Sequence, residues 1–137
     1  METLSLPEEL YSRMLGHFLS AYPNEACGII SSADDAGPEF HPMTNIEPTP
    51  VSYLMDPAEQ FRLQKELREK GRRMLAICHS HPASPAFPSG KDVSLAFYDD
   101  AVYLIVSLLD RDRPECRAFE ITGGAVREVG LVIAVRS

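Results

Sequence analysis

The sequence is poor in several residue types that mark particular protein classes. Its 137 residues include three cysteines, no tryptophan and 13 basic side chains against 20 acidic ones, for a formal net charge of −7. Cys27, Cys78 and Cys116 are odd in number and have no CxxC spacing, which suggests neither a disulfide framework nor a cysteine-based zinc finger. A nucleic-acid partner is not expected, because phosphate binding draws on a basic surface.

Long apolar runs are also missing. The run AVYLIVSLL at 101–109 is much shorter than the ~20 residues that a membrane-spanning helix needs. The first residues, METLSLPEEL, carry acids and no basic side chain, which is the wrong charge pattern for a secretory signal. We therefore expect a cytoplasmic protein with no membrane partner, folded as one domain over residues 1–137.

Three segments have helical patterns. Apolar side chains recur every four positions over 7–22, which predicts an amphipathic helix. Asp56 as N-cap and Glu59 as the reciprocal capping acid predict a second helix, which continues to residue 71. A short third helix is expected over 89–98, with a serine at its N-cap.

Extended patterns occur between these helices. The segment 38–55 contains four prolines and is expected to form one or two short strands around an irregular loop. Gly123 and Gly124 suit the positive backbone dihedral angles of a hairpin turn. Further strands are predicted at 25–32, 72–81, 101–109, 115–122 and 125–135. The expected fold is therefore α/β, a single-domain mixed β-sheet flanked by helices.

The stretch AICHSHPASPAFPSGKDVS, at 76–94, has the spacing of a metal site. On a strand, side chains two positions apart share a face, so His79 and His81 present two imidazoles together. Asp92, in the first turn of the capped helix, can supply a third donor after the prolines turn the chain back. Two histidines, one carboxylate and an open position are typical of a catalytic zinc site.

Hydrolysis of an amide at such a site needs a further group. Zinc lowers the pKa of its bound water to about 7, but a nearby carboxylate must still take that proton and return it to the leaving amine. The motif HSHP, six residues, then SGKD, with NEACG upstream, resembles the signature of the JAMM (MPN+) metalloprotease family, and every position of that signature is filled.

The resemblance covers most of the chain and implies the JAMM/MPN fold, which is similar in outline to cytidine deaminases. It implies one zinc ion per chain, bound by His79, His81 and Asp92. It also implies that Glu25 is the general acid/base and that Ser89 helps to stabilise the tetrahedral oxyanion. The chain also resembles the small bacterial members, which are similar to enzymes that release cysteine or another small group from a sulfur-carrier protein.

The hypothesis is therefore a zinc metallopeptidase that hydrolyses an amide or isopeptide bond after the C-terminal Gly-Gly of a ubiquitin-like or sulfur-carrier protein. The alternatives are a catalytically silent MPN scaffold and a zinc hydrolase of small peptides. Base deamination is disfavoured, because the PCxxC signature is absent. Structural roles also stay open: Ser89 with Asp92 as a plain capping box, Glu25 as a strand-edge acid, and Cys78 as a buried apolar residue opposite His79.

Overall fold

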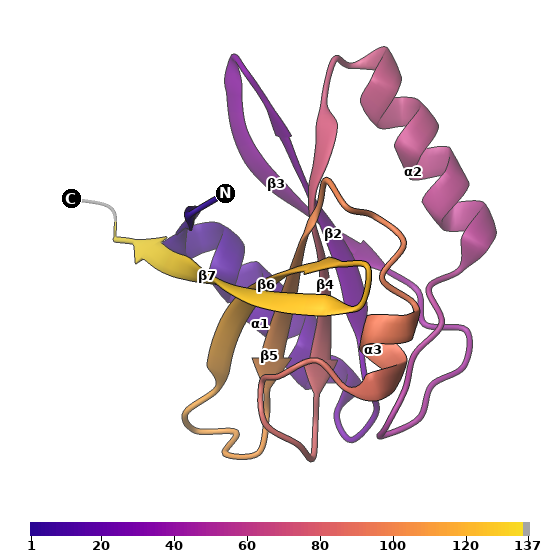
Figure 1. Ribbon diagram of the computed structural model, residues 1–137, viewed down its shortest axis with the longest axis vertical. Coiled ribbons are helices and arrows are strands. Elements are labelled where there is room, and N and C mark those ends of the chain that lie inside the picture. The colour runs from indigo at the N-terminus through magenta and orange to yellow at the C-terminus, as the bar shows by residue number, and fades with distance from the viewer. Residues whose placement is uncertain (136–137) are drawn as a thin grey trace.

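A seven-stranded mixed sheet organises the computed structural model, which describes residues 1–135 (Figure 1). The strand order is β1-β7-β6-β5-β4-β2-β3. The strands are β1 (Thr3–Pro7), β2 (Cys27–Ala33), β3 (Ala36–Met43), β4 (Arg73–His81), β5 (Val102–Ser107), β6 (Glu115–Thr122) and β7 (Ala125–Ala134). The helices are α1 (Glu8–Ala21), α2 (Pro57–Glu69) and α3 (Gly90–Ser94). The predicted mixed α/β class is confirmed.

Parallel and antiparallel pairs are both present in the sheet. The pairs β1·β7 and β4·β5 are parallel, and the other neighbours are antiparallel. All six residues of β5 are buried, which agrees with the continuous apolar run of its sequence. The β6–β7 turn has positive φ at Gly123 and Gly124, as the sequence predicts for this hairpin.

The two faces of the sheet have separate apolar cores. On one face, Met14 and Phe18 of α1 pack with strand residues such as Leu104. On the other face, Ile105 and Phe119 belong to a second core, which α2 and the segment before it border. Alternate side chains of a strand point to opposite faces, so β4 and β5 contribute to both cores.

Strand β1 was not predicted from the sequence. Its five residues show only a short alternation, with Leu4 and Leu6 buried and their neighbours exposed. They form a strand because β7 offers its free edge, with Leu4 paired to Leu131 from the far end of the chain. The predicted first helix consequently begins at Glu8, after Pro7 has served as its N-cap residue.

Helix α2 begins at the predicted residue, but the carboxylate of Glu59 has a different hydrogen-bond partner from the predicted one. Asp56 accepts a hydrogen bond from the backbone N–H of Ala58, which confirms it as the N-cap. Glu59 was predicted to bond back to this cap, but its carboxylate accepts bonds from the backbone N–H and hydroxyl of Thr44. The helix therefore holds the segment that follows β3. None of the helices within residues 1–135 is long and apolar enough to cross a membrane.

Candidate metal centre and adjoining cleft

The last residues of β4 carry the two histidines of the candidate site. His79 and His81 are buried, and the intervening Ser80 points to the other side of the strand. The Ser80 hydroxyl oxygen accepts a hydrogen bond from the backbone N–H of Ala26 at 2.9 Å, and the His81 carbonyl accepts one from the Leu108 N–H at 2.9 Å. Both histidines therefore project from a strand end that is fixed on each side.

Asp92 reaches the histidines from α3. The Ser89 hydroxyl oxygen accepts a bond from the Asp92 N–H at 3.0 Å, and the Asp92 Oδ2 accepts one from the Ser89 N–H at 2.9 Å. This is the capping box that the sequence predicts, although the helix is shorter than expected and ends at Ser94. The box fixes the Asp92 carboxylate against the end of β4.

Three donor atoms converge at this point. The Nε2 atoms of His79 and His81 lie 3.0 Å apart, and the Asp92 Oδ2 lies 3.2 Å from the first and 3.0 Å from the second. The His81 Nδ1–H donates to the Pro85 carbonyl at 2.9 Å, because a carbonyl can only accept. In neutral His81 the lone pair is therefore on Nε2, which faces the other two donors.

These residues fit a zinc ion. Zinc bonds of about 2.0–2.1 Å in a tetrahedral site place neighbouring ligand atoms roughly 3.3–3.4 Å apart, so the three atoms need to open by only a few tenths of an ångström. Two imidazole nitrogens and a carboxylate oxygen lack the protons to satisfy one another fully, whereas a cation between them satisfies all three. Among residues 1–135, these three form the His/Cys/Asp/Glu group that could hold a metal ion.

The pKa values in this cluster shift in different directions. Burial lowers the pKa of His79 despite its contact with Asp92. Burial also lowers the pKa of His81, but the hydrogen bonds with Asp92 and Pro85 outweigh it and leave a raised value. Burial raises the pKa of Asp92, yet its hydrogen bonds with His79 and His81 leave it well below the ordinary range. The carboxylate is therefore charged, as a metal ligand must be.

Glu25 lies beside the cluster, two residues before the start of β2. The β2–β4 register pairs Cys27 with His79, and its continuation puts Glu25 next to His81. Glu25 is 5% exposed, and its Oε1 has no hydrogen-bond partner within residues 1–135. Burial raises the pKa of Glu25 to about 7, with smaller contributions from the charges of His81, Asp92 and Lys91.

The backbone around Glu25 is held by the segment after β3. Its N–H donates to the Thr49 carbonyl at 2.8 Å, and its carbonyl accepts a bond from the Asn45 side chain at 2.9 Å. The sequence predicted Glu25 on the strand itself, but the ladder begins only at Cys27. Glu25 is therefore set by loop contacts, which do not follow from a strand pattern.

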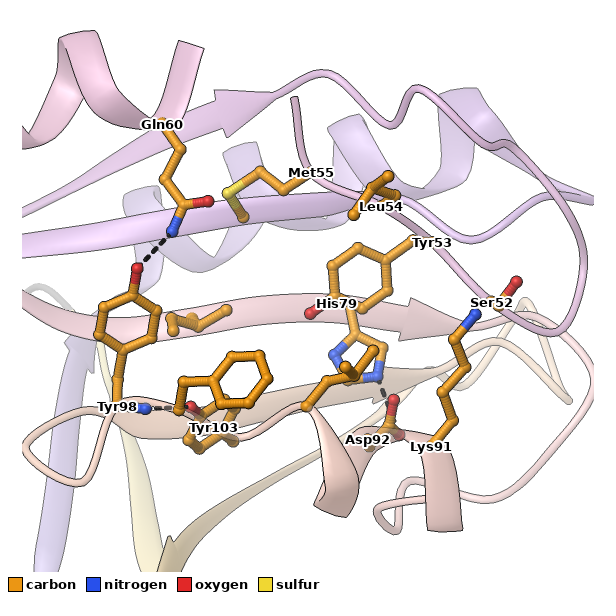
Figure 2. A pocket seen from close by; sticks show the side chains of 13 residues that line it. Ser52, Tyr53, Leu54, Met55, Gln60, His79, Lys91, Asp92, Tyr98 and Tyr103 are labelled. Carbon is orange, nitrogen blue, oxygen red and sulfur yellow. Dashed lines mark hydrogen bonds and ion pairs between the residues drawn. The ribbon is translucent and has the colours of Figure 1, made fainter. Parts of the chain in front are cut away.

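A cleft of about 200 Å³ adjoins the cluster (Figure 2). One wall is the extended segment 52–55, and the other includes α3 and the residues that follow it. Most of the lining is apolar or aromatic, including Leu54, Met55 and Phe97. Gln60, which donates a hydrogen bond to the Tyr98 hydroxyl at 2.9 Å, closes the end of the cleft away from the histidines.

Two residues of this cleft were missed from the sequence. Tyr53 stacks on the His79 ring with 4.8 Å between ring centroids and 30° between planes, and burial raises its pKa. Its only sequence signal is a place in the irregular segment 38–55. Lys91 also lines the cleft. It is the third residue of SGKD, a position for which the signature specifies no residue type, and spacing alone assigns it no role.

The remaining cysteines and histidines stay outside the cluster. Cys27 and Cys78 are free and belong to opposite cores, so the two thiols do not form a disulfide. Cys78 is fully buried among apolar residues, as predicted. His17 Nε2 lies 2.9 Å from the Cys27 carbonyl, and His41 Nε2 lies 2.7 Å from the Ser31 hydroxyl.

Residues 7–122 match the family described as prokaryotic homologs of the JAB domain. The chain is 38% identical over 127 residues to the CysO-cysteine peptidase of Mycobacterium tuberculosis, an alignment that covers 91% of this chain and 87% of the relative. It is 30% identical over 105 residues to the desampylase of Pyrococcus furiosus, with coverage of 77% and 74%. The chain belongs to the JAB-domain family, and the resemblance to JAMM proteins is confirmed.

Solved structures agree with this assignment. A protein from Desulfitobacterium hafniense superposes with a TM-score of 0.85 at 36% identity, covering 96% of this chain and 93% of the other. A JAB1/MPN domain protein from Archaeoglobus fulgidus has a TM-score of 0.58 at 20% identity, with coverage of 96% and 99%, and supports the fold alone. The predicted JAMM/MPN fold is therefore confirmed.

Proposed function

We propose that this protein is a zinc-dependent hydrolase of the amide bond that follows the C-terminal Gly-Gly of a ubiquitin-like or sulfur-carrier protein. The observation that carries the proposal is the convergence of His79, His81 and Asp92 beside the buried carboxyl of Glu25. The names of the relatives, a CysO-cysteine peptidase and a desampylase, support the same class of reaction.

His79, His81 and Asp92 would hold the metal, one ion per chain. A bound zinc ion would act as a Lewis acid on the scissile carbonyl and ease deprotonation of the attacking water. The His81 Nδ1–H bond to Pro85 keeps the lone pair of Nε2 directed at that ion. The Ser89–Asp92 capping box keeps the carboxylate in place while substrate enters and leaves.

Glu25 is proposed to carry the proton. The carboxylate accepts a proton from water as the oxygen adds to the scissile carbonyl carbon. It then gives that proton to the leaving nitrogen as the C–N bond breaks, which leaves a carboxylic acid on the carrier and a free amine. The second proton of the water then passes from this acid to the amine, so the final products are a carboxylate and an ammonium. Burial raises the pKa of Glu25 in the metal-free site, and a cation bound beside it would lower that pKa, so the group would be the carboxylate that accepts the proton from water.

Ser89 is proposed to stabilise the oxyanion of the tetrahedral intermediate. Its hydroxyl oxygen is engaged as acceptor from the Asp92 N–H, which leaves the hydroxyl hydrogen available for donation. A donor aimed at a developing oxyanion is typically worth about 3–4 kcal/mol of the activation barrier. The capping role and the catalytic role can therefore be filled by the same side chain.

The cleft is proposed to receive the tail of the carrier protein. Its apolar lining and modest volume suit an extended peptide, and two glycines have no side chains to obstruct the approach to the metal. The intact set of donors and the buried Glu25 favour an enzyme over a silent scaffold.

The test compares two carrier proteins of ubiquitin-like fold, one ending in Gly-Gly-Cys and one in Ala-Ala-Cys. The zinc-loaded enzyme should remove the cysteine from the first and cleave the second at least about tenfold more slowly, because methyl groups obstruct a narrow groove. Intact-mass measurement over time follows both reactions. Equal rates would contradict the proposed tail recognition, and no cleavage of either protein would contradict the substrate class.

A further inference from the structure

Lys91 is a cation without an acidic partner at the mouth of the cleft. Its side chain is exposed and makes no ion pair within residues 1–135. Lys65 on α2 is likewise exposed and makes no ion pair in that range, so it is the position of Lys91 that sets it apart. Lys91 lines the cleft together with His79 and Asp92.

The position of Lys91 defines which part of a substrate it can meet. Figure 2 shows its side chain extending from α3 toward Ser52 on the opposite wall, at the end of the cleft that holds His79 and Asp92. The apolar remainder of the cleft runs from there toward Gln60 and leaves no second cation along its lining. A tail lying in that apolar part brings its last carbonyl to the metal centre and directs the leaving group past it, toward Lys91.

When the leaving group is an α-amino acid, it carries a negative charge on its α-carboxylate. Its carboxylate lies two bonds from the nitrogen that Glu25 protonates, so a group that binds this carboxylate must stand close to Glu25. Lys91 meets this requirement by its place, because it adjoins Asp92, whose Oδ2 lies 3.0 Å from the His81 Nε2. The β2–β4 register in turn puts Glu25 next to His81. An isopeptide bond to a lysine side chain has no carboxylate at that place.

We infer that Lys91 binds the α-carboxylate of the leaving group, and that the enzyme is therefore selective for carriers ending in a single amino acid with a free carboxylate. The inference rests on the proposed function and narrows its substrate to this class. Ser52, whose hydroxyl lies toward the Lys91 ammonium in Figure 2, forms the opposite side of this subsite. An ammonium–carboxylate contact of this kind, partly exposed to solvent, corresponds to about a tenfold preference.

The experiment uses one carrier protein of ubiquitin-like fold ending in Gly-Gly-Cys, prepared as the C-terminal acid and as the C-terminal carboxamide. Zinc-loaded wild type, Lys91→Met and Lys91→Arg are compared by kcat/KM on both substrates. Wild type should prefer the acid about tenfold, mainly through KM, because the contact exists before and during the reaction. Lys91→Met should bring the ratio near one, and Lys91→Arg should retain it.

Lys65→Met is the matched control, because it removes the same charge from an exposed position on α2 that does not line the cleft. It should keep the wild-type ratio of acid to carboxamide. If Lys91→Met keeps the wild-type ratio of acid to carboxamide, the inference is overturned. This holds whether kcat/KM on both substrates is unchanged or falls equally, and an equal fall would mean that Lys91 acts on the chemical step. If wild type cleaved neither substrate, the proposed function itself would fail, and the inference with it.

Discussion

Replacing Glu25 by glutamine should make the metal-free protein more stable above neutral pH and at the same time remove its activity. Burial raises the pKa of Glu25 from 4.5 to about 7, and each pKa unit corresponds to about 1.4 kcal/mol. The buried charge therefore costs up to about 3 kcal/mol of folding free energy once it is ionised. Glutamine keeps the shape of the side chain and removes the charge.

The direction of the pH dependence follows from proton binding. Below pH 4.5 the carboxyl is protonated in both the folded and the unfolded chain, so no penalty arises. Between about pH 4.5 and 7 the folded protein binds more protons at Glu25 than the unfolded chain, and its stability falls as the pH rises. The penalty is complete above about pH 7, and Glu25→Gln should therefore stabilise at pH 8 and change little at pH 4.5.

Thermal unfolding in the presence of a chelator measures this difference. A gain of about 1–3 kcal/mol should raise the midpoint at pH 8 by roughly 3–10 °C for a domain of this size. Glu128→Gln is the matched control, since Glu128 is exposed and its pKa is lowered by the Arg117 hydrogen bond. It should give no stabilisation at pH 8. A Glu25→Gln protein that is less stable than wild type at pH 8, or equally changed at both pH values, would refute the argument.

Three further substitutions test the packing, the strand end and the metal ligands. Gly28→Ala should lower the free energy of unfolding, measured by urea denaturation, by about 1–3 kcal/mol, because the added Cβ meets the buried Phe40 ring at 2.5 Å. Gly37→Ala is the control and should change the free energy of unfolding little, because the space around it is open. Ser80→Ala should cost about 1–3 kcal/mol in the same assay and lower kcat, because it leaves a buried N–H beside the proton-transfer group without its acceptor. Asp92→Ala should lose the metal by elemental analysis of the purified protein, and retention of one zinc per chain would contradict its role as ligand.

The parts of this fold that could be predicted depend on local signals. The Asp56 cap, the Ser89 capping box and the glycine turn are each encoded within a few residues, and the structure has all three. Strand β1 escaped prediction because its pairing of Leu4 with Leu131 joins the two ends of the chain. Five residues with two buried leucines do not carry a strand pattern without that partner.

In the candidate site, too, some features follow from local sequence signals and others do not. The two-residue spacing of His79 and His81 places both on one strand face, so their convergence could be predicted from sequence. The stacking of Tyr53 on His79 and the reach of Lys91 across the cleft could not be predicted. Both depend on how the loop after β3 and the short α3 pack against β4, which no local pattern encodes.

The most direct test of the account is intact-mass measurement of a carrier protein ending in Gly-Gly-Cys after incubation with zinc-loaded wild type or zinc-loaded Glu25→Gln. The account predicts loss of one cysteine residue with wild type. It predicts a rate lower by about 10²- to 10⁴-fold with Glu25→Gln, although both proteins bind one zinc ion, because general acid/base catalysis is removed and the ligands are not. Equal cleavage by the two proteins, or loss of zinc from Glu25→Gln, would contradict the assignment of Glu25 as the proton carrier.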